Sequence, residues 1–150
     1  MHLPNEIIFR GLGGTAIPLS FLVLTPKHVP LPVVIVGTVV MSGGLALVLW
    51  SQATLGRNWI GGIGLRKGHK LITSGPYSMV RNPLYTGIAI VIVGGAIACM
   101  NPLLIPAGAL FWLSMAIRVP SEEELMQKKF RKQWDAYVAS TGCFVPRFRR

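Results

Sequence analysis

A chain of 150 residues has room for one domain and not for a second hydrophobic core. About half of its residues are apolar and only 13% are charged, whereas a soluble domain carries about a quarter charged residues. The formal net charge of +10 would also suit a nucleic-acid partner, but anionic lipid headgroups explain it better in a chain this apolar. The alternative is a soluble protein with buried, strongly apolar helices.

Three apolar stretches predict the membrane-spanning helices. Residues 7–25 form the weakest candidate, because an arginine and a proline interrupt them. Residues 31–50 carry no charge, and neither do residues 84–117. The last stretch is long enough for two spans of roughly 20 residues, which turn at residues 99–102. We expect an all-α integral membrane protein with about four transmembrane helices.

The basic residues predict how these helices are oriented. Five lie between the second and third apolar segments and eight lie from Arg118 to the end, whereas the turn near Asn101 carries none. Positive charge accumulates on the cytoplasmic side, so both termini and the loop 51–87 are expected there. Cys99 and Cys143 have no spacing typical of a metal or redox site, and no metal is expected.

The chain reads as a single membrane domain in two parts. Residues 1–50 look like a helical scaffold, in which small residues such as Gly37, Gly43 and Gly44 let helices approach closely. Residues 51–150 form the functional core. Residues 55–64, with Trp59 and several glycines, predict a loop or re-entrant segment at the interface. The stretch from there to Gly87 is too long for a simple linker.

The C-terminal part predicts an amphipathic helix on the cytoplasmic face. Ser121 provides an N-cap and three glutamates follow it, which suits the positive end of a helix dipole. Aromatic and aliphatic residues then recur at helical spacing between lysines and arginines. Four of the five acidic residues of the chain lie in this part, so it is expected to do more than anchor the protein.

The segment Gly75–Gly87 carries the strongest functional signal. It places two prolines, two tyrosines and Arg81 directly before an apolar run. Irregular backbone at membrane depth is tolerated where it is buried in protein or lines a polar cavity. The chain has no zinc-protease, phosphate-loop, serine-hydrolase or dinucleotide motif. A site at the cytoplasmic interface would take a water-soluble cosubstrate from one side and a lipid-soluble one from the bilayer.

At this point the sequence resembles a known family. Residues 69–87 look like the signature of the isoprenylcysteine carboxyl methyltransferases, and Arg118 with Glu122-Glu123 and the closing residues 144–146 looks like its second motif. Members are integral membrane enzymes that use S-adenosyl-L-methionine, and their relatives include phospholipid methyltransferases. The resemblance covers about residues 50–147.

The resemblance implies roles at the matching positions. Arg118 is expected to face a lipophilic methyl acceptor that enters from the bilayer, and to act in catalysis. Asn82 stands where many members have histidine, so its amide must replace an imidazole there. The residues implied in S-adenosyl-L-methionine binding are His69, Lys70, Leu71, Ile72, Tyr77, Asn82, Pro83, Leu84, Tyr85 and Glu122.

Three functions follow from this pattern. The first is carboxyl O-methylation of an isoprenylcysteine-like or other lipophilic acceptor, which needs alignment but no base because the carboxylate is already ionised. The second is N-methylation of a phospholipid or other amine, for which Glu122, Glu123 or His69 would remove the proton. The third is a non-catalytic membrane scaffold or transporter subunit with the same fold.

Overall fold

The computed structural model describes residues 28–58 and 70–147. Within these ranges the chain is helical, and its only β-type pairing is an isolated bridge between Val80 and Gly142. The all-α class is therefore confirmed for the described residues. The helices are α2 (Leu31–Leu55), α3 (Pro83–Cys99), α4 (Leu104–Phe130) and α5 (Lys132–Ser140), with short 3₁₀ turns at Gly56–Asn58 and Gly75–Ser78.

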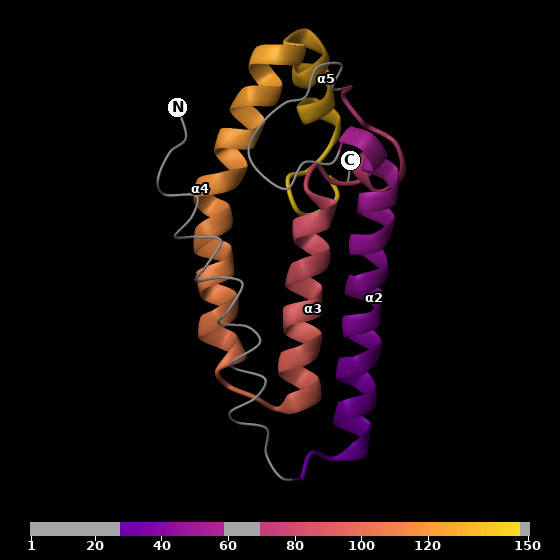
Figure 1. Ribbon diagram of the computed structural model, residues 1–150, viewed down its shortest axis with the longest axis vertical. Coiled ribbons are helices and arrows are strands. Elements are labelled where there is room, and N and C mark those ends of the chain that lie inside the picture. Colours follow the sequence, from indigo (N-terminus) through magenta and orange to yellow (C-terminus); the bar gives the residue numbers. More distant parts are fainter. Residues whose placement is uncertain (1–27, 59–69, 148–150) are drawn as a thin grey trace.

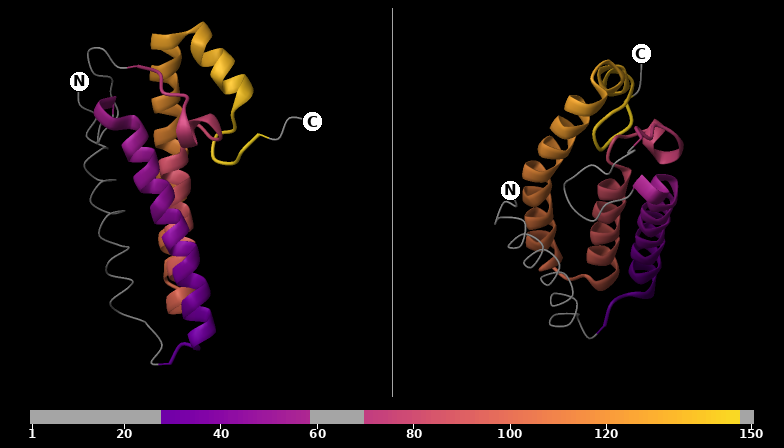
Figure 2. Two further views of the ribbon diagram at one scale, coloured as in Figure 1. Left: turned by 90° about the vertical axis from the view of Figure 1, so that its right-hand side faces the viewer. Right: turned by 45° about the horizontal axis from the view of Figure 1, so that its top comes forward.

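The three long helices run side by side, with α3 between α2 and α4 (Figure 1). A tight turn joins α3 to α4 at one end of the molecule, and α4 extends past α3 at the other end (Figure 1). There α5 folds back, and the segment after it returns to the start of α3 (Figure 2). We call this end, formed by the start of α3, the last turns of α4, and α5, the polar end.

Two of the described helices are candidate membrane spans by length and composition. Both α2 and α4 are long and apolar enough to cross a bilayer. The 17 residues of α3 make about 25 Å of helix, slightly less than the hydrocarbon core. Large apolar side chains such as Ile105 point outward, as expected of a membrane protein. The expected span at residues 7–25 lies outside the described residues, as does most of the expected re-entrant segment.

Glycines let α2 and α3 pack in close contact. Gly44 of α2 faces the backbone of α3 so closely that an added Cβ would lie 2.8 Å from the carbonyl oxygen of Gly87. A Cβ on Gly87 would in turn lie 2.9 Å from the carbonyl oxygen of Gly44. Gly37 and Gly94 meet the opposite helix in the same way, one heptad along. Of the glycines expected to serve packing, Gly37 and Gly44 do so, whereas a Cβ at Gly43 would have no atom of another segment within 4 Å.

The expected turn between the last two apolar helices is confirmed. α3 ends at Cys99, where Met100 adopts a left-handed conformation with φ of 44°. The Asn101 side chain is buried, and its Oδ1 accepts a hydrogen bond of 3.0 Å from the backbone N–H of Leu103. Capping of this kind satisfies a backbone donor that the start of the next helix leaves free.

The expectation that a separate helix begins at Ser121 is wrong. α4 runs without a break through Pro120 to Phe130, and the Ser121 hydroxyl donates to the carbonyl of Ile117 inside the helix. The break lies instead at Arg131, whose φ is 48°, and α5 starts directly after it. An N-cap residue signals a helix start only when the preceding residues leave the helical conformation, and here the span continues into the polar tail.

Candidate functional site

The irregular segment at the start of α3 is shorter than the sequence suggests. Gly75, with φ of 59°, opens a 3₁₀ turn, but Pro83 already occupies the first turn of α3. A proline is favourable there because the first helical N–H groups have no intrahelical partner. Residues 83–87 are therefore helical, and their side chains lie in the register of α3.

The chain end pairs with this irregular segment. The backbone N–H of Arg81 donates to the carbonyl of Gly142 at 2.8 Å, and that of Asn82 donates to the carbonyl of Cys143 at 3.0 Å. The Thr86 hydroxyl also lies 3.0 Å from the Phe144 carbonyl. These bonds fasten residues 142–144 to the start of α3 and close the polar end.

Tyr85, Arg118 and Glu122 form a hydrogen-bonded cluster across α3 and α4. The Nε–H of Arg118 points at the Tyr85 hydroxyl and at Glu122 Oε1, both at 2.8 Å. The Tyr85 hydroxyl donates in turn to the Glu122 carboxylate, whose two oxygens both lie 3.1 Å away. Arg118 and Glu122 are four residues apart on α4, so both project toward α3.

This cluster leaves part of Arg118 unused. Within the described residues, its Nη1 and Nη2 make no hydrogen bond to the protein, although the side chain is only 27% exposed. A guanidinium presents its donors as a planar fork that matches a carboxylate. The cluster therefore combines the Glu122 carboxylate, which is held in place and can accept further hydrogen bonds, with Arg118, whose Nη1 and Nη2 can still donate.

A second cluster joins Arg81 to Glu123. Arg81 Nε lies 2.9 Å from Glu123 Oε1, and Arg81 Nη1 donates to the Thr141 carbonyl at 2.7 Å. The Asn82 amide faces Glu123 and Cys143 at 3.4–3.5 Å. Burial, and after it the charge of Glu123, raises the pKa of the Cys143 thiol, which therefore stays protonated at neutral pH. Sequence reasoning missed the Arg81–Glu123 ion pair.

The other residues expected at the site are spread more widely. Tyr77 is buried next to α5, where its carbonyl accepts a hydrogen bond of 2.7 Å from the Tyr137 hydroxyl. Burial raises the pKa of the Tyr77 phenol above its usual value. Pro83 is buried and Leu84 is half-buried in the first turn of α3. Residues 70–72 make no described contact with the Tyr85 cluster, and His69 lies outside the described residues.

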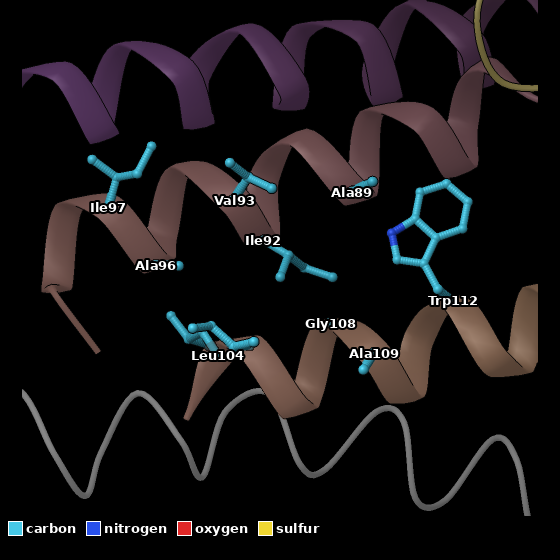
Figure 3. A pocket seen from close by; sticks show the side chains of 10 residues that line it. Ala89, Ile92, Val93, Ala96, Ile97, Leu104, Gly108, Ala109 and Trp112 are labelled. Atoms are coloured by element: carbon cyan, nitrogen blue, oxygen red, sulfur yellow. The ribbon is translucent and has the colours of Figure 1, made fainter. Parts of the chain in front are cut away.

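An apolar groove of about 470 Å³ lies between α3 and α4. Ile92 of α3 and Trp112 of α4 point into it (Figure 3). Its last residues toward the polar end are Ala89 and Trp112. Ala89 is one helical turn from Tyr85, and Trp112 is about 9 Å along α4 from Arg118 at 1.5 Å per residue. The groove therefore leads toward the polar cluster.

No group of three or more metal-ligating side chains occurs in the part of the chain that the structure describes. The polar end offers carboxylates, arginines, tyrosines and amides instead. The described site is thus suited to binding charged organic groups.

Comparison with known proteins identifies relatives of this chain. The model of the family described as phospholipid methyltransferase matches residues 32–133. Protein-S-isoprenylcysteine O-methyltransferase B of Arabidopsis thaliana is 33% identical over 96 residues, which cover 62% of this chain and 49% of the relative. A probable protein-S-isoprenylcysteine O-methyltransferase of Oryza sativa subsp. indica is 33% identical over 123 residues, covering 80% and 61%.

A further relative carries a different kind of name. The nickel-cobalt-cadmium resistance protein NccN of Alcaligenes xylosoxydans xylosoxydans is 37% identical over 99 residues, which cover 65% of this chain and 46% of that protein. The chain thus spans about half of the length of several curated relatives that it matches. The family match extends over more than half of the chain and includes α2, α3 and α4. The chain belongs to the phospholipid methyltransferase family.

Proposed function

We propose that the chain is a membrane methyltransferase that uses S-adenosyl-L-methionine and methylates the carboxylate of a lipophilic acceptor, such as an isoprenylated cysteine. The observation that carries the proposal is the Tyr85–Arg118–Glu122 cluster beside an apolar groove. The names of the plant relatives support the same reaction.

The donor set of the cluster fits the cofactor. The Glu122 carboxylate, held by Tyr85, accepts hydrogen bonds from an ammonium group or ribose hydroxyls, and the rings of Tyr77 and Tyr85 attract a sulfonium. Bound S-adenosyl-L-methionine would supply an electrophilic methyl group. The cofactor contacts that we propose are His69, Lys70, Leu71, Ile72, Tyr77, Asn82, Pro83, Leu84, Tyr85 and Glu122.

We assign the acceptor to Arg118 and the groove. The two unused nitrogens of Arg118 orient an acceptor carboxylate, and the groove receives its apolar chain. The side chains of Arg118 and Glu122 are only about a quarter exposed, and a partly dehydrated site favours a reaction in which a negative and a positive charge combine. No proton has to be removed from a carboxylate acceptor.

N-methylation of an amine is the second candidate, and the description of the family favours it. It requires a base to remove a proton. Glu122 is already hydrogen-bonded by Tyr85 and Arg118, and Glu123 by Arg81. Both carboxylates are thus already engaged by side chains of the protein, and these contacts favour the carboxylate acceptor over the amine.

We also propose that the polar end faces the cytoplasm. Lys128, Lys129, Arg131 and Lys132 lie there, whereas the turn at residues 99–103 at the opposite end carries no charge. In a variant without native cysteines, a cysteine at position 100 should react with an impermeant maleimide in intact cells. A cysteine at position 132 should react only after permeabilisation, and the reverse pattern would contradict this orientation.

Cofactor binding tests the proposed function. We expect S-adenosylhomocysteine to bind the purified protein in detergent, and Glu122→Ala to weaken binding by about 10- to 100-fold, because a hydrogen bond to a charged group contributes about 1.5–3 kcal/mol. Glu124→Ala is the matched control, since Glu124 is exposed and, among the described residues, pairs with Lys128. Isothermal titration measures both. Absence of heat with the wild-type protein would contradict the proposal.

Narrowing the groove should weaken binding of the acceptor and leave binding of the cofactor unchanged. Ala109 lines the groove, so Ala109→Phe is expected to raise the KM for a long-chain acceptor about tenfold, as if two methylene groups lost their burial. Leu110→Phe is the control, because Leu110 lies outside the groove and is exposed. Equal KM values for the two variants would show that the groove does not hold the chain.

A further inference from the structure

The Arg81–Glu123 ion pair has no part in the proposed function, yet it lies directly beside the cluster that does. Glu122 and Glu123 are consecutive on α4, so their side chains project about 100° apart around the helix. The Glu122 carboxylate accepts a hydrogen bond from Tyr85, and the Glu123 carboxylate accepts one from Arg81. Arg81 precedes Tyr85 by four residues. The end of α4 is therefore attached at two points to the start of α3.

The described hydrogen bonds that join residues 81–85 to α4 are made by Arg118, Glu122 and Glu123. The apolar groove lies between α3 and the first turns of α4, away from these contacts. Pro120 lies between Arg118 and Glu122, and it removes one backbone hydrogen bond from α4 at that level. The direction in which Glu122 projects thus depends on contacts made beyond Pro120.

Arg81 is well placed to provide these contacts. Its side chain is 11% exposed, and it bonds Glu123 through Nε and Nη2 and the Thr141 carbonyl through Nη1. Its backbone N–H bonds the Gly142 carbonyl. Arg81 therefore links the start of α3, the end of α4 and the segment that follows α5.

We propose that Arg81 and Glu123 are positioning residues, whose ion pair sets the rotation of the end of α4 so that Glu122 and Arg118 meet Tyr85. The effect of the ion pair on the rotation of α4 does not depend on which reaction the protein catalyses. Its consequence for cofactor binding rests on the proposed function, in which Glu122 contacts the cofactor.

A spectroscopic experiment tests the geometric part. The chain has three tyrosines, so protein labelled with 3-fluorotyrosine gives three fluorine signals, and Tyr85→Phe identifies one of them. We expect Arg81→Ala to move the Tyr85 signal toward its position in Glu122→Ala. In the Glu122→Ala background, Arg81→Ala should leave the Tyr85 signal where it is.

The conservative variant sharpens this test. Arg81→Lys keeps a cation that can reach one carboxylate oxygen, so it should return the Tyr85 signal part of the way to its wild-type position. If Arg81→Ala does not fold, Glu123→Gln replaces it, because the amide keeps the shape of the side chain and removes the charge that pairs with Arg81. A Tyr85 signal unchanged in the folded variant would overturn the inference.

Cofactor affinity tests the consequence. Arg81→Ala should weaken S-adenosylhomocysteine binding about tenfold in the wild-type background and less than about twofold when Glu122 is already alanine, because residues that act through one contact are not additive. Equal weakening in both backgrounds would mean that Arg81 does not act through Glu122. A wild-type protein that binds no S-adenosylhomocysteine would contradict the proposed function, and the fluorine signals would still decide the geometric inference.

Discussion

Replacing Arg118 with alanine is expected to lower kcat by about 100-fold or more, while the affinity for S-adenosylhomocysteine changes by less than about threefold. Loss of a donor that orients the reacting group typically costs a factor of 10² to 10³ in kcat. Binding survives because the Tyr85 hydroxyl still lies 3.1 Å from both oxygens of Glu122 and holds the carboxylate in place. Steady-state kinetics and isothermal titration on the same preparation measure the two quantities.

Two control variants belong with this experiment. Arg118→Lys should recover a minor part of the lost activity, because a lysine supplies the charge without the planar fork. Arg147→Ala should behave as the wild type, since Arg147 is exposed and its side chain makes a long bond to the Ala139 carbonyl and no other bond within residues 28–58 and 70–147. If Arg118→Ala and Glu122→Ala lose binding and turnover to the same extent, the division of roles between acceptor and cofactor is wrong.

Gly44→Leu should destabilise the protein far more than Gly43→Leu. A Cβ at position 44 would lie 2.7 Å from the backbone nitrogen of Val91 and 2.8 Å from the Gly87 carbonyl oxygen, so α2 and α3 would have to separate. Overpacking of this kind costs about 3 kcal/mol. A Cβ at Gly43 would have no atom of another segment within 4 Å, and the substitution gains the same helix propensity.

Thermal unfolding in detergent, followed by circular dichroism, measures this difference. Gly43→Leu is the matched control, because the two positions are adjacent on one helix and both variants add the same side chain. Similar melting temperatures for the two variants would contradict the close packing of α2 on α3.

Those parts of the fold that depend on local pattern could be predicted from the sequence. The charge-free stretch after residue 30 became α2, and the turn at residues 99–102 lies where a polar Asn-Pro pair interrupts the longest apolar run. The continuation of α4 through Pro120 could not be predicted, because a proline and a capping residue are the usual signs of a boundary. Whether the helix continues through Pro120 depends on packing along the whole of α4, which no local sequence pattern shows.

Part of the candidate site could also be predicted from the sequence, and part could not. The resemblance grouped Tyr85, Arg118 and Glu122, and these three side chains are in contact. The Arg81–Glu123 ion pair joins residues 42 positions apart and has no local pattern. One sign was available: the side chains of consecutive residues on a helix project about 100° apart, so Glu122 and Glu123 face different neighbours. The pairing of residues 80–82 with residues 142–144 depends on the chain path and left no such sign.

Transfer of a labelled methyl group tests the central claim most directly. The purified protein in lipid would be incubated with S-adenosyl-L-methionine carrying a tritiated methyl group and with either a farnesylated cysteine or phosphatidylethanolamine. We expect base-labile label, typical of a methyl ester, on the farnesylated cysteine, and a rate of labelling lower by about 100-fold or more with Arg118→Ala. Label on the amine alone would replace the proposed acceptor with the second candidate, and absence of label on both acceptors and on extracted membrane lipids would contradict the assignment as a methyltransferase.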